Sequence, residues 1–224
     1  ETATTLRILG DSLRVIGKFQ PAEIVLKRSL DIATQLQLPA AIALAQLSLG
    51  NISRIQVSSN NSNAQRNKNL VIPEEKSLNF YQQAGKSTSP NIRVQAQLNQ
   101  LSLLADKKVG LLNDEKYQNT AKTLLSQVKQ EIEALPPSRT KIQTRINLAY
   151  TMMAIREQIP TATSHKEIAQ ILAVAVKQAK DLGNPRTLSY ALGTLGNVYE
   201  QSPKGDKTLE KFTNKPNNGK KHEN

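Results

Sequence analysis

Apolar residues recur at steps of three and four along most of the chain, and this spacing predicts amphipathic helices. Three stripes show it best. They consist of Tyr117, Ala121, Leu124, Leu125, Val128, Ile132 and Leu135; of Ala22, Val25, Leu26, Ser29, Leu30, Ala33 and Leu36; and of Ile168, Ile171, Leu172, Ala175, Ala179 and Leu182. No stretch keeps the alternation of a β-strand for long. We therefore predict an all-α fold.

Proline and glycine divide the pattern into separate helices. Pro39 and Pro185 each follow the end of an apolar helix, Pro73 precedes two acidic residues at a helix start, and Pro136-Pro137 is a hard break. The helices expected from these signals span about 3–18, 21–37, 40–56, 74–85, 91–109, 117–135, 138–157, 165–182 and 186–200.

The same signals suggest one domain with two polar segments. We expect residues 1–200 to form a single helical repeat domain, interrupted by a polar loop at residues 57–72 that is rich in Ser and Asn. Residues 201–224 lose the apolar stripe and are rich in Lys, Asn, Pro and Gly, which is typical of a disordered tail.

An internal repeat is the most informative feature of the sequence. Two segments match at a constant offset of 146 positions, and each contains a helix end, a proline turn and a helix with Leu-Gly-Asn. The first segment contributes Ala33, Leu36, Pro39, Ala45, Leu49, Gly50 and Asn51, and the second Ala179, Leu182, Pro185, Ala191, Leu195, Gly196 and Asn197. A weaker third copy begins at residues 87–90 and continues with Ala96 and Leu98. Repeated helix pairs are the signature of a solenoid.

Two antiparallel helices cannot bury both of their apolar faces alone, whereas stacking the next pair covers them. Gly and Ala at the crossing points would let neighbouring helices approach closely. We therefore predict a right-handed α–α superhelix, a tetratricopeptide-like solenoid of about four and a half helix hairpins.

The spacing resembles the tetratricopeptide motif. Leu9-Gly10, Leu13, Ala22 and Leu26 follow it in part, whereas Leu192, Leu195-Gly196 and Tyr199 match its first helix more fully. Leu49-Gly50 keeps the pair but has Ser53 in place of the aromatic residue. Over residues 3–200 the chain looks like the repeat region of prokaryotic, often cyanobacterial, CHAT-domain proteins. In that family the repeats precede a caspase-like peptidase domain, which needs a catalytic Cys and His.

The composition leaves little for catalysis. The chain has no Cys and two His, so thiolate zinc sites, disulfides and the peptidase activity of the resembled family are excluded. His165 reads as a solvent-exposed residue at a helix start. The acid pairs Glu74-Glu75 and Asp114-Glu115 also sit at helix starts, where the helix dipole favours them, and Glu131/Glu133 is a third such pair. No glycine-rich phosphate loop is present. We expect no catalytic residues, no cofactor and no metal.

A formal net charge of +12 keeps a second function class open. Arg145 and Arg156 are eleven positions apart, about three helical turns, so they could share one face and form part of a basic groove. The excess charge is spread along the chain, however, and few aromatic residues are present to stack on bases. We expect a protein or peptide partner, with nucleic-acid binding as the alternative.

The partner surface should lie on the first helix of each pair. The polar residues predicted to line it are Asn51, Arg54, Asn99, Arg145, Asn147, Asn197 and Glu200. The final helix lacks a partner in this scheme, so Tyr190, Val198 or Tyr199 should be partly exposed and could support dimerisation.

The sequence also suggests where the protein is located in the cell and whether it is part of a longer chain. The absence of Cys fits a reducing compartment, and no run of about eighteen apolar residues could span a membrane, so we expect a cytoplasmic protein without membrane contact. The chain opens with Glu1-Thr2-Ala3, with neither Met nor a leader, as expected for a piece of a longer protein.

Overall fold

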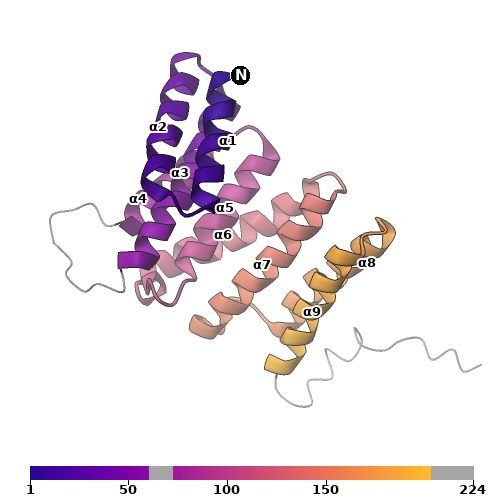
Figure 1. The fold of residues 1–224 in the computed structure, drawn as a ribbon. Coiled ribbons are helices and arrows are strands. Elements are labelled where there is room, and N and C mark those ends of the chain that lie inside the picture. The colour runs from indigo at the N-terminus through magenta and orange to yellow at the C-terminus, as the bar shows by residue number, and fades with distance from the viewer. Residues whose placement is uncertain (61–72, 203–224) are drawn as a thin grey trace, which may run out of the picture. The chain divides into compact units, whose positions relative to one another are not determined.

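The computed structural model describes residues 1–60 and 73–202, which form helices joined by short turns (Figure 1). The elements in these ranges are α1 (Thr2–Val15), α2 (Phe19–Gln35), α3 (Pro39–Asn60), α4 (Pro73–Ala84), α5 (Pro90–Leu104), the short 3-10 helix η1 (Leu111–Asn113), α6 (Glu115–Ala134), α7 (Arg139–Gln158), α8 (His165–Asp181) and α9 (Pro185–Gln201). No strand occurs among the described residues. The predicted all-α class is confirmed.

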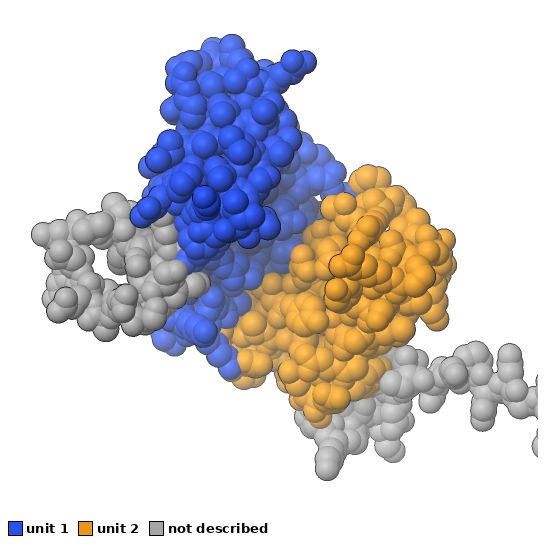
Figure 2. Space-filling model, in the orientation of Figure 1, with its two compact units in different colours: residues 1–135 blue, residues 136–224 orange. Residues whose placement is uncertain are grey.

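The chain divides into two compact units, Glu1–Leu135 and Pro136–Asn224 (Figure 2). Their boundary lies at the Pro136-Pro137 break that the sequence marks. Where the sequence suggested one repeat domain over residues 1–200, the structure thus separates two groups of helices.

Consecutive helices pack against each other within each unit. In the first unit α1 to α5 each contact the next helix, and α1 with α3 and α3 with α5 also touch. Figure 1 shows α1 and α2 lying side by side as a hairpin. In the second unit α7, α8 and α9 contact one another. Contacts between neighbouring helices and between alternate helices are those expected when helix hairpins stack.

The 146-residue offset holds for whole helices. α2 and α8 begin and end 146 positions apart, and Pro39 and Pro185 are the first residues of α3 and α9. Pro90 likewise begins α5, the third copy. Seven buried positions correspond at this offset: Ala22, Leu26, Ser29, Ala33, Ala45, Leu49 and Ile52 match Ile168, Leu172, Ala175, Ala179, Ala191, Leu195 and Val198.

The turn between α2 and α3 and the turn between α8 and α9 have the same hydrogen-bond pattern. The amide of Leu38 donates to the carbonyl of Ala33 at 2.9 Å, and Asn184 donates to Ala179 at 3.0 Å. Each turn needs one residue with positive φ, which is Gln37 at 51° in the first copy and Gly183 at 59° in the second. Glycine adopts this conformation without the steric cost that Gln37 bears, about 1–2 kcal/mol.

Several predicted boundaries are wrong. α3 continues to Asn60, four residues into the expected polar loop, and α5 ends at Leu104. Residues 105–110 form turns instead, in which Asp106 accepts backbone hydrogen bonds and Gly110 has a φ of 73°. Residues 61–72 and 203–224, which include most of the expected loop and tail, lie outside the described residues.

The apolar stripes are correct except at their ends. On α6 and just after it, Ala121, Leu124, Leu125, Val128, Ile132 and Leu135 are all buried. Leu36 and Leu182 are 61% and 49% exposed, and each is the residue that caps the C-terminus of its helix. The stripe therefore ends one turn earlier than the spacing suggests.

Two of the repeated glycines lie where helices approach closely. A Cβ atom on Gly10 of α1 would lie 2.5 Å from the Cγ of Leu26 on α2, and one on Gly50 of α3 would lie 2.6 Å from the Cε1 of Tyr81 on α4. Gly196 of α9 corresponds to Gly50 in the repeat. Among the described residues, no heavy atom outside its own helix lies within 4 Å of a Cβ placed on it. The expected close approach is thus confirmed at Gly10 and Gly50 and is wrong at Gly196.

This difference gives a matched pair of substitutions. Gly50→Ala should lower the free energy of unfolding of the first unit by about 1–3 kcal/mol, because Tyr81 is buried and its ring cannot move aside. Gly196→Ala should instead be neutral or stabilise the second unit by up to about 1 kcal/mol, since alanine favours helix and the space is open. Urea unfolding followed by circular dichroism measures both. Equal destabilisation by the two changes would contradict the difference in packing.

Candidate binding surfaces

Two of the predicted site residues meet where α3 and α5 run alongside each other. The side-chain oxygen of Asn51 accepts hydrogen bonds from the hydroxyl of Tyr81 and from the side-chain amide of Asn99, each at 2.9 Å. The oxygen of Asn99 accepts in turn from Gln95 at 2.8 Å. Asn51 and Asn99 are hydrogen-bonded to each other, and both are half-buried, so part of each side chain still faces solvent.

Arg54 extends these polar contacts between α3 and α5, which we call the α3–α5 seam, by one helical turn. Its guanidinium donates to the hydroxyl of Ser102 at 3.1 Å and to the carbonyl of Ser102 at 3.3 Å, and it lies 3.9 Å from the carboxylate of Asp106. The pairs Asn51–Asn99 and Arg54–Ser102 are both 48 positions apart, so the two helices lie in parallel register here. Arg54 therefore holds α3 to α5 and is already engaged before any partner arrives.

The ring of Tyr81 on α4 packs against α3 in the first unit. It is fully buried against Gly50, and Ser77 on the same helix donates to the carbonyl of Gly50 at 2.9 Å. Burial raises the pKa of the Tyr81 phenol above its ordinary value of 10.0, and the positive charge of Arg54 offsets part of the rise.

The predicted residues of the second unit do not form a comparable cluster. Arg145 is only 3% exposed and donates to the side chain of Gln178 on α8 at 3.2 Å, so the expectation that it lines an open face is wrong. Asn147 and Glu200 are exposed, and half-buried Asn197 accepts from Gln201. Arg145 was expected on the open face because arginine side chains are mostly exposed to solvent.

Arg156 does not share an open basic face with Arg145. Its guanidinium donates to the carbonyls of Pro160 and Thr163, at 3.0 and 2.6 Å, and to the ring of His165 at 3.2 Å. His165 does begin α8, as predicted, but it is half-buried beside Arg156 rather than fully exposed. These contacts fix the turn between α7 and α8.

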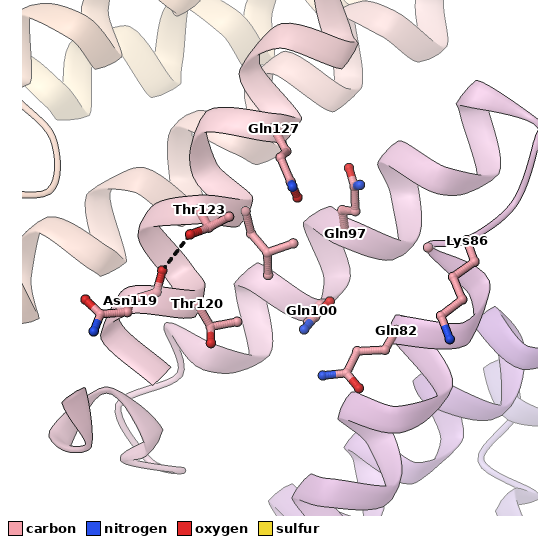
Figure 3. Close-up of a pocket in the computed structure, with 10 residues that line it drawn as sticks. Gln82, Lys86, Gln97, Gln100, Asn119, Thr120, Thr123 and Gln127 are labelled. Atoms are coloured by element: carbon pink, nitrogen blue, oxygen red, sulfur yellow. Dashed lines mark hydrogen bonds between the residues drawn. The ribbon is translucent and has the colours of Figure 1, made fainter. Parts of the chain in front are cut away.

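The first unit carries a groove that was not predicted from the sequence (Figure 3). It measures about 600 Å³ and is formed by α4, α5 and α6. Gln97 and Gln100 of α5 line its floor, and Asn119 and Gln127 of α6 line one side. Gln82 of α4 lies on the other side (Figure 3). Five amide side chains from three helices thus converge on one depression.

A weak signal for this groove exists in the sequence. Asn119, Thr123 and Gln127 are spaced by four and form a polar row directly beside the apolar stripe of α6. Such a row normally faces open solvent, and only tertiary packing brings Gln97 and Gln100 opposite it.

The structure also has two further grooves and several acidic side chains at helix starts. A groove of about 420 Å³ lies beside α2, α3 and α4, and one of about 480 Å³ lies near Arg156 and His165. Two of the three acid pairs start helices, as predicted, since Glu74 and Glu75 lie in the first turn of α4 and Asp114 caps α6. Among the described residues, no three His, Cys, Asp or Glu side chains are grouped as metal ligands.

The last described helix is only partly exposed as predicted. Tyr190 is 53% exposed and Leu192 is also exposed, whereas Tyr199 is half-buried. Val198 is fully buried, so of the three residues named only the two tyrosines are partly exposed. No helix in the described part of the chain has the length and apolar character needed to cross a bilayer.

Comparison of the sequence with models of known protein families and with curated proteins finds no match. The resemblance to tetratricopeptide repeats therefore rests on the residues quoted above.

The shared oxygen of Asn51 gives a test of the α3–α5 seam. Asn51→Ala should lower the free energy of unfolding by about 1–3 kcal/mol, because the buried hydroxyl of Tyr81 loses its acceptor. In a Tyr81→Phe background the same change should cost less, since no hydroxyl remains to be satisfied. Urea unfolding of the two single variants and the double variant measures the coupling. Strictly additive effects would show that this hydrogen bond contributes nothing to stability.

The raised pKa of Tyr81 predicts a loss of stability in alkali. The folded chain keeps the phenol proton to a higher pH than the unfolded chain. The protonated phenol therefore makes its full contribution to the free energy of unfolding below about pH 10, and this contribution is lost as the pH rises through the folded pKa. Urea midpoints compared at about pH 9 and about pH 11 should fall more for the unsubstituted chain than for Tyr81→Phe. A fall of the same size in both would assign the effect to other groups.

Proposed function

We propose that this chain is a non-catalytic scaffold that binds another protein through stacked helix hairpins. The observation that carries the proposal is the repeated unit of α2–α3 and α8–α9. The two copies agree in the bounds of α2 and α8, the first residues of α3 and α9, the turn hydrogen bonds and seven buried positions. Repeats of this kind build long surfaces of exposed helix faces, and such surfaces suit an extended peptide or a helix from a partner.

The proposal includes the relationship suggested by the sequence. The glycines at positions 10 and 50, each packed against the next helix, and the buried Ala22 and Leu26 support a degenerate tetratricopeptide repeat. We further propose that the chain is the repeat region of a larger cytoplasmic protein of the CHAT type, in which a separate domain would supply any chemistry.

The arginines favour a protein partner over a nucleic acid. Arg54, Arg93, Arg145 and Arg156 all donate to groups within their own unit. Binding to a phosphate backbone draws its affinity from cations that face the ligand. Four guanidiniums that already hold helices and turns together contribute less to such a surface.

Affinity capture with the whole chain tests the proposal. A lysate of the source cells is passed over the immobilised chain, retained proteins are identified by mass spectrometry, and the leading one is purified and titrated by calorimetry. We expect saturable binding that survives nuclease treatment and changes little with salt. Retention of RNA alone, lost steeply as salt rises, would instead favour the nucleic-acid alternative.

Variants can show whether the predicted face takes part. Asn147→Ala combined with Glu200→Ala removes the two exposed predicted residues of the second unit, and Gln170→Ala on α8 is an exposed control. Weaker binding of the purified partner by the double variant only would place the contact on α7 and α9. Equal binding by all three chains would remove these residues from the site.

A further inference from the structure

We propose that the amide-lined groove of the first unit binds an extended peptide segment through hydrogen bonds to its backbone. This inference rests on the scaffold function proposed above and assigns a site and a ligand chemistry to it. It differs from the face predicted by sequence, because the groove is formed by α4, α5 and α6 and includes none of the seven predicted residues.

The key residue is Gln97, which is held in place by charged neighbours. Arg93 donates to Glu131 of α6 at 2.6 Å and to the carbonyl of Ser87 at 2.8 Å, and the other carboxylate oxygen of Glu131 accepts from the amide nitrogen of Gln97 at 3.3 Å. A carboxylate accepts hydrogen bonds and cannot donate them. The nitrogen of Gln97 must therefore face Glu131, and its carbonyl oxygen must point away.

That carbonyl oxygen has no donor. Gln97 is only 8% exposed, and its Oε1 atom is buried without a hydrogen-bond partner. An unsatisfied buried acceptor is costly, and native proteins leave few of them. Because Gln97 lines the groove, a small shift of its side chain would bring this oxygen to a ligand N–H group, which would supply the missing donor.

The other lining residues extend this pattern along the groove. Gln100 is buried beside Gln97, and Gln82, Asn119 and Gln127 face the same space from α4 and α6 (Figure 3). A side-chain amide donates and accepts at once, as a peptide group does. A series of amides can thus pair with the alternating N–H and C=O groups of an extended chain, largely without regard to its side chains.

The charge of the groove also favours a peptide. Lys86 is the one charged residue among those that line it, and Leu124 provides an apolar contact. A nucleic acid would place a phosphate at every nucleotide and would require more cations than this. We therefore assign the groove to a peptide that carries an acidic side chain near Lys86.

A phage library of random linear peptides, selected on the whole chain, provides the probe. Enriched peptides are synthesised, and their affinity is measured by fluorescence anisotropy. Gln100→Ala combined with Gln127→Ala, and separately Gln97→Met, should each weaken binding by about tenfold or more. Gln130→Ala, an exposed change on α6 outside the groove, should leave affinity unchanged. Circular dichroism confirms that each variant is folded.

Backbone methylation of the peptide makes the test specific. N-methylation removes one N–H donor at a time, and one position should weaken binding to the unsubstituted chain by about tenfold but have little effect on Gln97→Met. A coupled loss of this kind supports pairing with the oxygen of Gln97. The inference is overturned if no peptide is enriched, if the groove variants bind as tightly as Gln130→Ala, or if RNA alone is retained.

The two proposals fail in different ways. If the purified partner from the capture experiment binds the groove variants normally, the groove is not the site while the scaffold function stands. If no protein binds the whole chain saturably, the scaffold function itself fails.

Discussion

Close contact between neighbouring helices is the constraint on which this structure depends. Helices can share a narrow interface only where their facing side chains are small, and the chain places alanine or glycine at these points. Ala22, Ala33 and Ala45 are fully buried, as are Ala179 and Ala191 at the equivalent positions of the second unit. At Gly10 and Gly50 even a methyl group would collide with the next helix. Packing at this density leaves little tolerance for added volume.

Polar side chains add specificity to this small-residue packing. Between α3 and α5 the contact is made by Asn51, Asn99, Arg54 and Ser102, which bind each other across the interface. An apolar interface could slide by one helical turn with little penalty, whereas paired amides fit in one register. Arg93 and Glu131 make a similar link from α5 to α6. We interpret both sets as fixing the alignment of neighbouring helices, a role that polar groups serve in other helical assemblies.

The same link between α5 and α6 connects architecture with binding. Glu131 neutralises Arg93 and also accepts from the amide nitrogen of Gln97, a residue that lines the groove. The groove thus depends on contacts that also hold the helices together, which places its floor on rigid elements. A site formed in this way loses little entropy on binding, because its side chains are already ordered.

The sequence by itself determined the class of fold, most helix positions and the repeat. Periodicity, proline and glycine are local signals, and the offset of 146 positions identified the two equivalent turns. Local signals could not show that Arg145 is buried, that Val198 is covered or that no other described helix comes close to Gly196, because each outcome depends on residues distant in the chain. They also could not reveal the groove, since Gln97, Gln100 and Gln127 become one surface only when α5 packs against α6. Tertiary structure decided which polar residues face a shared space, because burial and unsatisfied hydrogen bonds are properties of the packed helices and not of the order of residues.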